Sequence, residues 1–317
     1  MKKSLIALAA LASISAFADT ALPAPTVTVY GLIDLSYGRA IATDDALILH
    51  DKNSTSRVGL KGTTDAGGGV KVNFNLEAGN ILIAPKAPTE ALFNRQAWAG
   101  FSGNFGEIRA GVQDSIAFQN NIGFDLNGAA NDSQAAGLAV VPTLGNSSGT
   151  LAQYISPDFG GLKAQVGYMP KTDNVALTAD AGAKAGYAFA VSYGKGPLAA
   201  AVTFQSATTD TNTLVNSNNL SIVSGSYDFG VAKLVGTFAN GGKNAVGYNF
   251  GVAVPVLGAS VGAQVAKNTD TNDTGVELFA NKEILKSMTA YADFGKKHVD
   301  ASGANFDAFS VGLIWAF

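Results

Sequence analysis

The feature that most constrains this chain is an alternation of apolar and polar residues that recurs to its end in segments of about ten residues. The clearest segment, 70–78, reads VKVNFNLEA, so every second residue from Val70 to Ala78 is apolar. Because successive side chains of a β-strand point to opposite faces, this pattern predicts a strand with one apolar and one polar face. The segments 287–294 and 305–317 repeat the pattern. A strand of about ten residues is long enough to cross a lipid bilayer when it tilts.

The connections between these segments alternate in length. Short turns built from Gly, Pro, Asp and Asn are followed by longer polar linkers, which is the layout of an outer-membrane barrel with tight turns on one side. Seven short turns would join fourteen strands, and a first and a last strand bring the number to sixteen. The short turns fall at 65–69, 104–106, 158–161, 195–197, 228–230, 255–258 and 285–287, and the longer linkers include 38–53, 79–92, 114–149, 170–181, 207–218 and 297–304.

The bilayer decides how such strands must be arranged. Each backbone polar group in hydrocarbon has to be paired within the protein, so strands can span a membrane only as a closed barrel. The apolar faces then contact lipid and the polar faces turn inward. Sixteen strands enclose more space than side chains can fill, so the interior holds water. We therefore expect an all-β fold, a 16-stranded antiparallel transmembrane β-barrel around a pore, with helix only inside 114–149.

The first eighteen residues have the form of a secretory signal. A basic start, Met1 to Lys3, precedes an apolar stretch, 4–14, and the small-x-small sequence of Ala16 to Ala18. We expect residues 1–18 to be removed and residues 19–317 to form one barrel domain. Removal takes away two lysines and no acid, so the net charge changes from −3 to −5. An acidic chain without basic runs gives no reason to expect a nucleic-acid partner.

Five short motifs follow one another along the chain. They are VTVYGLID at 27–34, SRVGLKG at 56–62, FNRQAWAG at 93–100, YISPDFGG at 154–161, and a terminal Phe317. Taken together and in this order, they resemble the general porin family of Gram-negative bacteria, in the trimeric branch typical of Neisseria and its relatives. The resemblance runs the whole mature length.

The resemblance implies that the third long loop, 114–149, folds into the barrel and faces basic side chains on the wall. The wall arginines of the family map onto Arg57 and Arg95, and Lys61 shares the face of Arg57. Strand periodicity by itself places Arg109 on the lumen face as well. The alternative for each of these residues is a charged side chain that is only solvated.

Within the third loop, the candidate acids that would face this wall are Asp125 and Asp132, and the alternative for both is an ordinary turn residue. One departure from the family concerns the position before the hairpin tyrosine, where relatives often carry an arginine and this chain has Gln153. The wall is thus less basic than in the family, so at most a mild preference for anions is expected.

The resemblance also implies partners. We expect membrane lipid around the barrel, a homotrimer held in part by the 79–92 loop, and small hydrophilic solutes and ions in the pore. The outward-facing Phe317 would be presented to the outer-membrane insertion machinery. The aromatic residues Tyr30, Trp98, Tyr168, Tyr187 and Trp315 either belong to interfacial girdles or simply fill strand positions.

Two short motifs that elsewhere indicate catalysis or calcium binding lack the surrounding residues that these functions need. The stretch 258–262 spells G-x-S-x-G, but it opens a strand, and the two histidines, His50 and His298, lie in expected outer loops. The stretch 270–275 begins like a calcium loop, but its twelfth position is Asn281 rather than glutamate. We expect no cofactor, no metal site and no enzyme. Two function classes remain: a passive general diffusion porin, or an outer-membrane barrel acting mainly as an adhesin, a surface-binding protein or a solute-selective channel.

Overall fold

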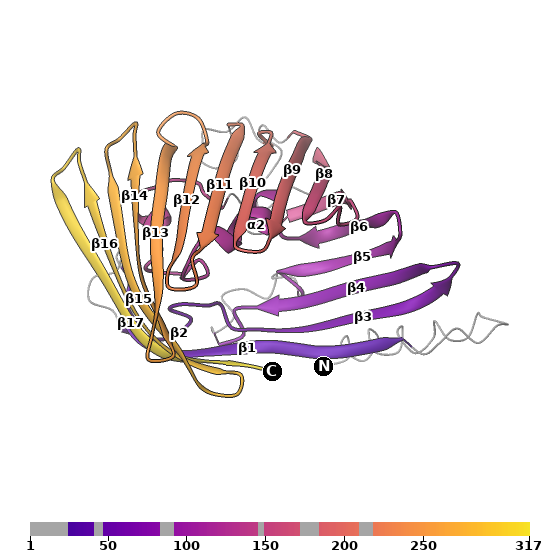
Figure 1. Cartoon of the computed structure of the whole chain (residues 1–317), viewed down its shortest axis with the longest axis horizontal. Helices are drawn as coiled ribbons and strands as arrows, with labels where there is room; N and C mark the ends of the chain where they lie inside the picture. The colour runs from indigo at the N-terminus through magenta and orange to yellow at the C-terminus, as the bar shows by residue number, and fades with distance from the viewer. Residues whose placement is uncertain (1–24, 41–46, 83–91, 145–148, 172–183, 209–217) are drawn as a thin grey trace.

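A computed structural model describes residues 25–40, 47–82, 92–144, 149–171, 184–208 and 218–317. They form one sheet that closes on itself, a barrel of sixteen antiparallel strands (Figure 1). Each strand pairs with its neighbours in the chain, and β1 pairs with both β3 and β17, which closes the ring. The expected fold class is confirmed; the expected signal, 1–18, lies outside the described residues. The barrel strands are β1 (Thr26–Arg39), β3 (Arg57–Gly67), β4 (Val70–Gly79), β5 (Gln96–Gly103), β6 (Gly106–Gln113), β7 (Gly149–Ile155), β8 (Leu162–Met169), β9 (Gly186–Lys195), β10 (Leu198–Gln205), β11 (Leu220–Asp228), β12 (Lys233–Asn240), β13 (Val246–Val256), β14 (Ala259–Asn268), β15 (Thr274–Leu285), β16 (Met288–Val299) and β17 (Ala304–Ala316).

The connections follow the expected alternation. Each of the seven short turns predicted from the sequence joins two consecutive strands, beginning with β3–β4 and ending with β15–β16. Two details differ from expectation. The linker 38–53 contains a short strand, β2 (Leu47–His50), which pairs with the end of β1. The last connection is only 300–303, because β16 and β17 continue their pairing as far as Val299 and Ala304.

Side-chain burial shows which face of the sheet is which. Large apolar residues such as Val191 and Phe238 are half-exposed on the outside, whereas polar residues such as Asp34 and Glu277 are fully buried inside. This inverted arrangement is the one required by a barrel with lipid outside and water inside. Tyr168, Tyr187 and Trp315 lie on the exposed outer face. Tyr30 and Trp98 instead line internal cavities, so these two are not girdle residues.

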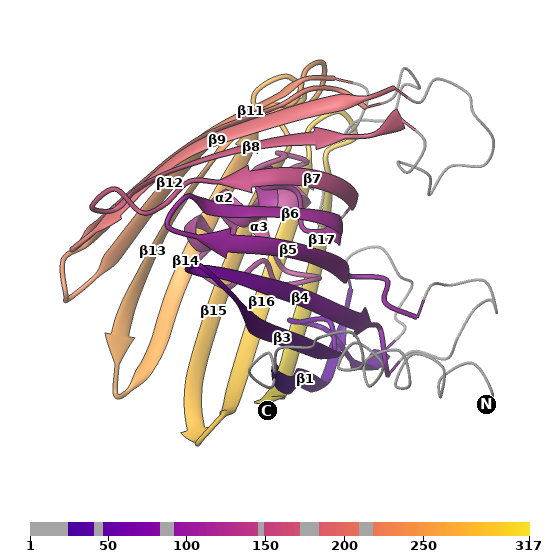
Figure 2. The same cartoon turned by 90° about the vertical axis from the view of Figure 1, so that its right-hand side faces the viewer.

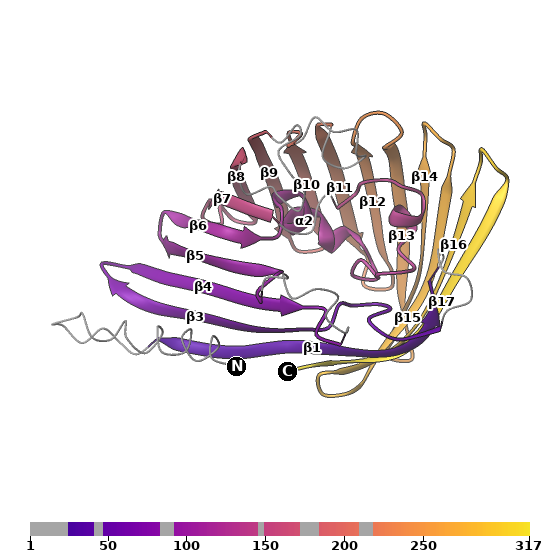
Figure 3. The same ribbon diagram turned by 180° about the vertical axis from the view of Figure 1, so that it is seen from behind.

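The third loop lies inside the barrel (Figures 2 and 3). It forms α2 (Ile116–Asn121), a 3-10 turn (Ile122–Phe124) and α3 (Ala135–Leu138), the only helical segments among the described residues. None of these helices is long and apolar enough to cross a membrane. α2 packs against β9 and β10, and α3 packs against β14 and β15.

The barrel wall under the loop is built from small residues. Alanines from the loop and the wall form a buried apolar cluster that includes Ile222. At Gly275 on β15, a Cβ atom would lie 2.0 Å from the backbone oxygen of Ala135, so only glycine allows the loop backbone to approach this closely. Ala and Gly residues interrupt the alternation of large apolar and polar residues in several strands. Their small size makes room for the third loop.

The ring closes where the two ends of the barrel meet. The backbone groups of Gly31 and Phe317 exchange two hydrogen bonds, both 3.0 Å long. The Phe317 ring lies over Gly31, where a Cβ atom would be 2.7 Å from the ring and 2.5 Å from the oxygen of Arg57. Because Gly31 has no side chain, it leaves the space on β1 that the Phe317 ring occupies.

We predict that Gly31→Ala weakens this closure. The added methyl group displaces either Phe317 or the β1–β3 backbone, an overpacking cost of about 1–3 kcal/mol. The temperature at which the barrel unfolds should fall. This temperature is measured from the change in mobility of the barrel on SDS electrophoresis after heating. Gly225→Ala is the matched control, because its Cβ atom on β11 would have only one neighbour, at 3.9 Å. Equal unfolding temperatures for the two variants would contradict the seam contact.

Candidate functional site

One cavity of about 670 Å³ separates the third loop from the wall formed by β1 and β3–β6. The chain contains four arginines, and three of them, Arg57, Arg95 and Arg109, line this cavity. They come from the β3, β5 and β6 region of one wall. Arg57 and Arg95 were expected there from the family resemblance, and Arg109 from strand periodicity. The opposite side is formed by loop residues, including Phe118 and Asn131.

The three guanidinium groups differ in their partners. Arg95 Nε donates to Glu77 Oε1 over 2.6 Å, so its charge is compensated. Arg57 has no carboxylate oxygen within 4.0 Å among the residues that the structure describes. Arg109 is held by the neutral amide oxygens of Gln113, at 2.6 Å, and Gln119, at 2.9 Å. A neutral partner orients the group without cancelling its charge, and Arg109 has only a distant carboxylate, Glu107, at 3.8 Å.

Two acids line the same cavity, Glu77 and Asp114, and neither was singled out from the sequence. Glu77 lies on the polar face of the segment 70–78 and also accepts from Tyr30 Oη over 2.8 Å. Asp114 begins the third loop, and burial raises the pKa of its carboxyl group, against the influence of Arg95. The strand pattern could have identified Glu77, because it predicts an inward side chain next to the expected arginine row.

Lys61 lies beside the main cavity rather than in it. It lines a second cavity of about 400 Å³, together with Asn73 and Glu107. The two cavities share Asn75, Trp98 and Arg109 in their linings, so they are parts of one continuous lumen. Lys61 is exposed to this space.

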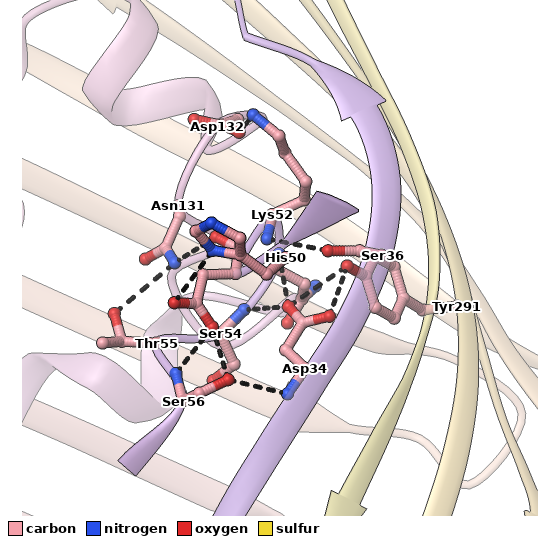
Figure 4. A network of polar contacts seen from close by, with 12 residues as sticks. Asp34, Ser36, His50, Lys52, Ser54, Thr55, Ser56, Asn131, Asp132 and Tyr291 are labelled. Atoms are coloured by element: carbon pink, nitrogen blue, oxygen red, sulfur yellow. Dashed lines mark hydrogen bonds and ion pairs between the residues drawn. The ribbon is translucent and has the colours of Figure 1, made fainter. Parts of the chain in front are cut away.

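Neither acid expected from the third loop lines the arginine cavity. Asp125 is buried, and its carboxylate accepts hydrogen bonds from the side chains of Gln134, at 3.0 Å, and Gln264, at 3.2 Å. Gln264 belongs to β14, on the wall opposite the arginines. Asp132 forms an ion pair with Lys52 over 2.7 Å (Figure 4). Both acids hold the loop in place rather than face Arg57 or Arg95.

The segment 51–56, which follows β2, is held in place by hydrogen bonds near the Lys52–Asp132 ion pair. In Figure 4 the segment 51–56 lies between β1 and the third loop, and the Asp34 side chain on β1 points toward this segment. The Asp34 carboxylate accepts from the backbone of Asn53 and Ser54, at 2.9 and 2.8 Å, and from Tyr291 Oη at 2.9 Å. The loop, this segment and the wall strands β1 and β16 are therefore one connected unit.

Other carboxylates lie beneath the loop. Asn127, in the loop, donates to Glu277 over 2.8 Å and to Asp293 over 3.1 Å, and Gln264 donates to Glu277 over 2.9 Å. Asp34, Asp125, Glu277 and Asp293 are at most 8% exposed, and none has a Lys or Arg partner within 4.0 Å among the described residues. Neutral amide and hydroxyl groups satisfy these acids, and none of the four lines the arginine cavity.

Known proteins identify this architecture. A family model described as Gram-negative porin matches residues 4–309, almost the whole chain. The chain belongs to this family. Outer membrane porin protein 32 of Delftia acidovorans is 33% identical over 98% of this chain and 94% of its own length. An outer membrane porin protein of Bordetella pertussis is 29% identical over 80% of this chain and 74% of its own length.

Solved porin structures are also similar to this chain. An anion-selective porin from Comamonas acidovorans has a TM-score of 0.74 and 25% sequence identity, covering 93% of this chain and all of that structure. OmpF of Salmonella typhi has a TM-score of 0.69 at 15% identity, covering 92% of this chain and 97% of its own, and shares the fold. The protein is thus an outer-membrane porin, a channel rather than an enzyme. Among the described residues of this porin, no group of His, Asp or Glu side chains could hold a metal ion.

Gln153, the residue that departs from the family pattern, lies where an added charge would act on the arginines. It is directly opposite Arg109 in the register of β6 and β7. Its side chain is buried in the porin wall, with its amide group 3.1 Å from that of Gln119. A neutral side chain thus occupies the lumen face next to Arg109.

The raised pKa of Asp114 predicts a pH dependence for the porin. A carboxylate whose pKa is raised takes up its proton at a higher pH than ordinary acids do. On acidification from pH 7, Asp114 therefore loses its negative charge at a higher pH than an ordinary aspartate does, and the permeability ratio of chloride to potassium should rise. Asp114→Asn should show the higher ratio already at pH 7 and lack this step.

Reversal potentials in a potassium chloride gradient measure this ratio. Asp158→Asn is the control, because Asp158 lies in an exposed turn, where a hydrogen bond from the Gly161 N–H lowers the pKa of its carboxyl group. Its pH profile should match that of the wild type. If Asp114→Asn also keeps the wild-type profile, Asp114 does not act on permeating ions.

Proposed function

We propose that this porin is a general diffusion channel with a mild preference for anions, set in the cavity between the third loop and the arginine wall. The supporting observation is that three of the four arginines of the chain converge there with only two carboxylates. The lining charges therefore leave one net positive charge. The overall charge of the protein matters less, because charges in bulk water are screened beyond about 8 Å.

The residues have distinct proposed roles. Arg57, Arg95 and Arg109 attract the permeating anion in the narrowest part, and Lys61 extends the basic wall into the neighbouring cavity. Glu77 limits the attraction by pairing with Arg95. In the low-dielectric surroundings of the barrel, charges that line a narrow passage act on ions more strongly than charges on the outer loops.

The loop acids have a different proposed role. Asp125 and Asp132 anchor the third loop and thereby fix the width of the passage. The loop also covers the carboxylates of Glu277 and Asp293, which would otherwise make the opposite wall acidic. Anion selectivity in the related Comamonas porin agrees with this sign.

Arg57→Ala should shift the reversal potential towards cations. One unit charge acting over about 6 Å in water is worth about 0.7 kcal/mol, so the chloride preference should fall about threefold at low salt. Conductance should hold or rise, because a bulky side chain leaves the passage. Arg95→Ala should shift the reversal potential in the same direction.

The fourth arginine provides the control. Arg39 pairs with Asp307 and lies by Phe309 on the outer surface. Arg39→Ala removes the same charge from outside the lumen and should leave the reversal potential unchanged. An equal response of the Arg39 and Arg57 variants would show that the arginine wall does not set selectivity.

We also infer that the porin assembles as a homotrimer, as the family resemblance implies. The loop expected to contact a neighbouring subunit, 79–92, lies mostly outside the described residues. Native electrophoresis in mild detergent tests the assembly, and a single monomer band would contradict it.

The terminal residue supports a further proposal, recognition by the insertion machinery. Phe317 ends β17 as an outward, half-exposed aromatic side chain. Deleting it should lower the amount of porin in the outer membrane and leave the conductance of the inserted protein unchanged. Normal insertion in cells would contradict this role, even if the refolded barrel were less stable through loss of the Gly31 contact.

A further inference from the structure

Two aromatic side chains of the arginine wall, Trp98 and Tyr30, face the lumen without being buried. The chain has two tryptophans: Trp315 is on the outer face, and Trp98 lines both internal cavities. Tyr30 lines the larger cavity and is also only partly buried. By contrast, the inward rings of Phe279 and Tyr291 are at most 4% exposed. Partly exposed rings on a lumen wall offer apolar surface to whatever passes.

Each of these rings lies next to a cation. The guanidinium carbon of Arg109 is 4.6 Å from the centre of the Trp98 ring, and Lys61 Nζ is 5.1 Å from the centre of the Tyr30 ring. Such distances are typical of cation–π contacts. The hydrogen-bond partners of Arg109 are neutral glutamines, so they do not compensate its positive charge. Charge and aromatic surface thus occur side by side.

Strand register places the four side chains on one continuous strip of wall. Lys61 on β3 pairs with Asn75 on β4, and Asn75 pairs with Trp98 on β5. The Tyr30 ring lies flat over Gly59, where a Cβ atom would be 2.5 Å from the ring. We call Tyr30, Lys61, Trp98 and Arg109 the basic–aromatic strip.

We propose that the basic–aromatic strip is a binding subsite for organic anions with a flat aromatic face, such as aromatic carboxylates. The cations attract the carboxylate, and the Trp98 ring stacks with the apolar ring of the solute. An inorganic anion such as chloride uses only the first of these interactions. The proposal rests on the anion-preferring pore described above and adds a solute class to it.

Benzoate and cyclohexanecarboxylate separate the two interactions, because both carry one negative charge and differ mainly in whether the ring is flat. In planar bilayers at neutral pH, reversal potentials should give the wild-type porin a permeability ratio of benzoate to cyclohexanecarboxylate of about three to ten. An aromatic contact of ordinary strength supplies a ratio of this size. Trp98→Leu should bring the ratio close to one, and Trp315→Phe, the matched control, should keep it.

A second measurement covers the possibility that Trp98→Leu does not fold. Trp315→Phe leaves Trp98 as the sole tryptophan, so its fluorescence reports on the strip alone. Benzoate should change this fluorescence with saturation, and cyclohexanecarboxylate should do so much more weakly. Equal permeation of the two anions through the wild-type pore, or equal fluorescence responses, would overturn the proposal.

These outcomes are independent of the proposed selectivity. The ratio compares two anions of equal charge, so it does not depend on the preference of the pore for chloride over potassium. A wild-type pore that prefers potassium would contradict the proposed function. A pore that prefers chloride but treats the two carboxylates alike would contradict only the subsite.

Discussion

Hydrogen bonding between neighbouring strands is the constraint on which the rest of this porin depends. Hydrocarbon offers no partner for a backbone amide, so the sheet has to close, and it does so where β1 meets both β3 and β17. Closure gives the sheet an inside and an outside. The period of two then assigns every strand residue to lipid or to lumen, and this assignment brings three arginines to one wall.

The third loop narrows a wide ring to a smaller passage. It contributes few charges to the passage itself; its main effect is to occupy space and to cover carboxylates on the opposite wall. Small residues on that wall, Gly275 above all, allow the loop backbone to lie against the strands. The acids beneath it bind amide groups such as that of Asn127, so the remaining lumen is lined mainly by the basic wall.

The local pattern of the sequence predicted the strands, the seven short turns and the inward direction of Arg109, because period and turn residues are local properties. The positions of Arg57 and Arg95 on the wall were expected from the family resemblance. It could not place Asp125 or Asp132, since the position of a loop inside a barrel depends on contacts with distant strands. Gln264, for example, binds Asp125 from 139 residues away. The short strand β2 was missed for the same reason. Tyr30 and Trp98 were left open, because an aromatic residue suits either face.

The contacts that hold the third loop also fix when it can take its position. Asn53 reaches Asp293 across 240 residues, and Asn127 reaches the same carboxylate across 166. These bonds join the segment after β2 and the third loop to β16, so neither can form before β16 is in place. Until these bonds have formed, the third loop is not fixed against the wall. A barrel without them would have a wider and more acidic bore than the one described here.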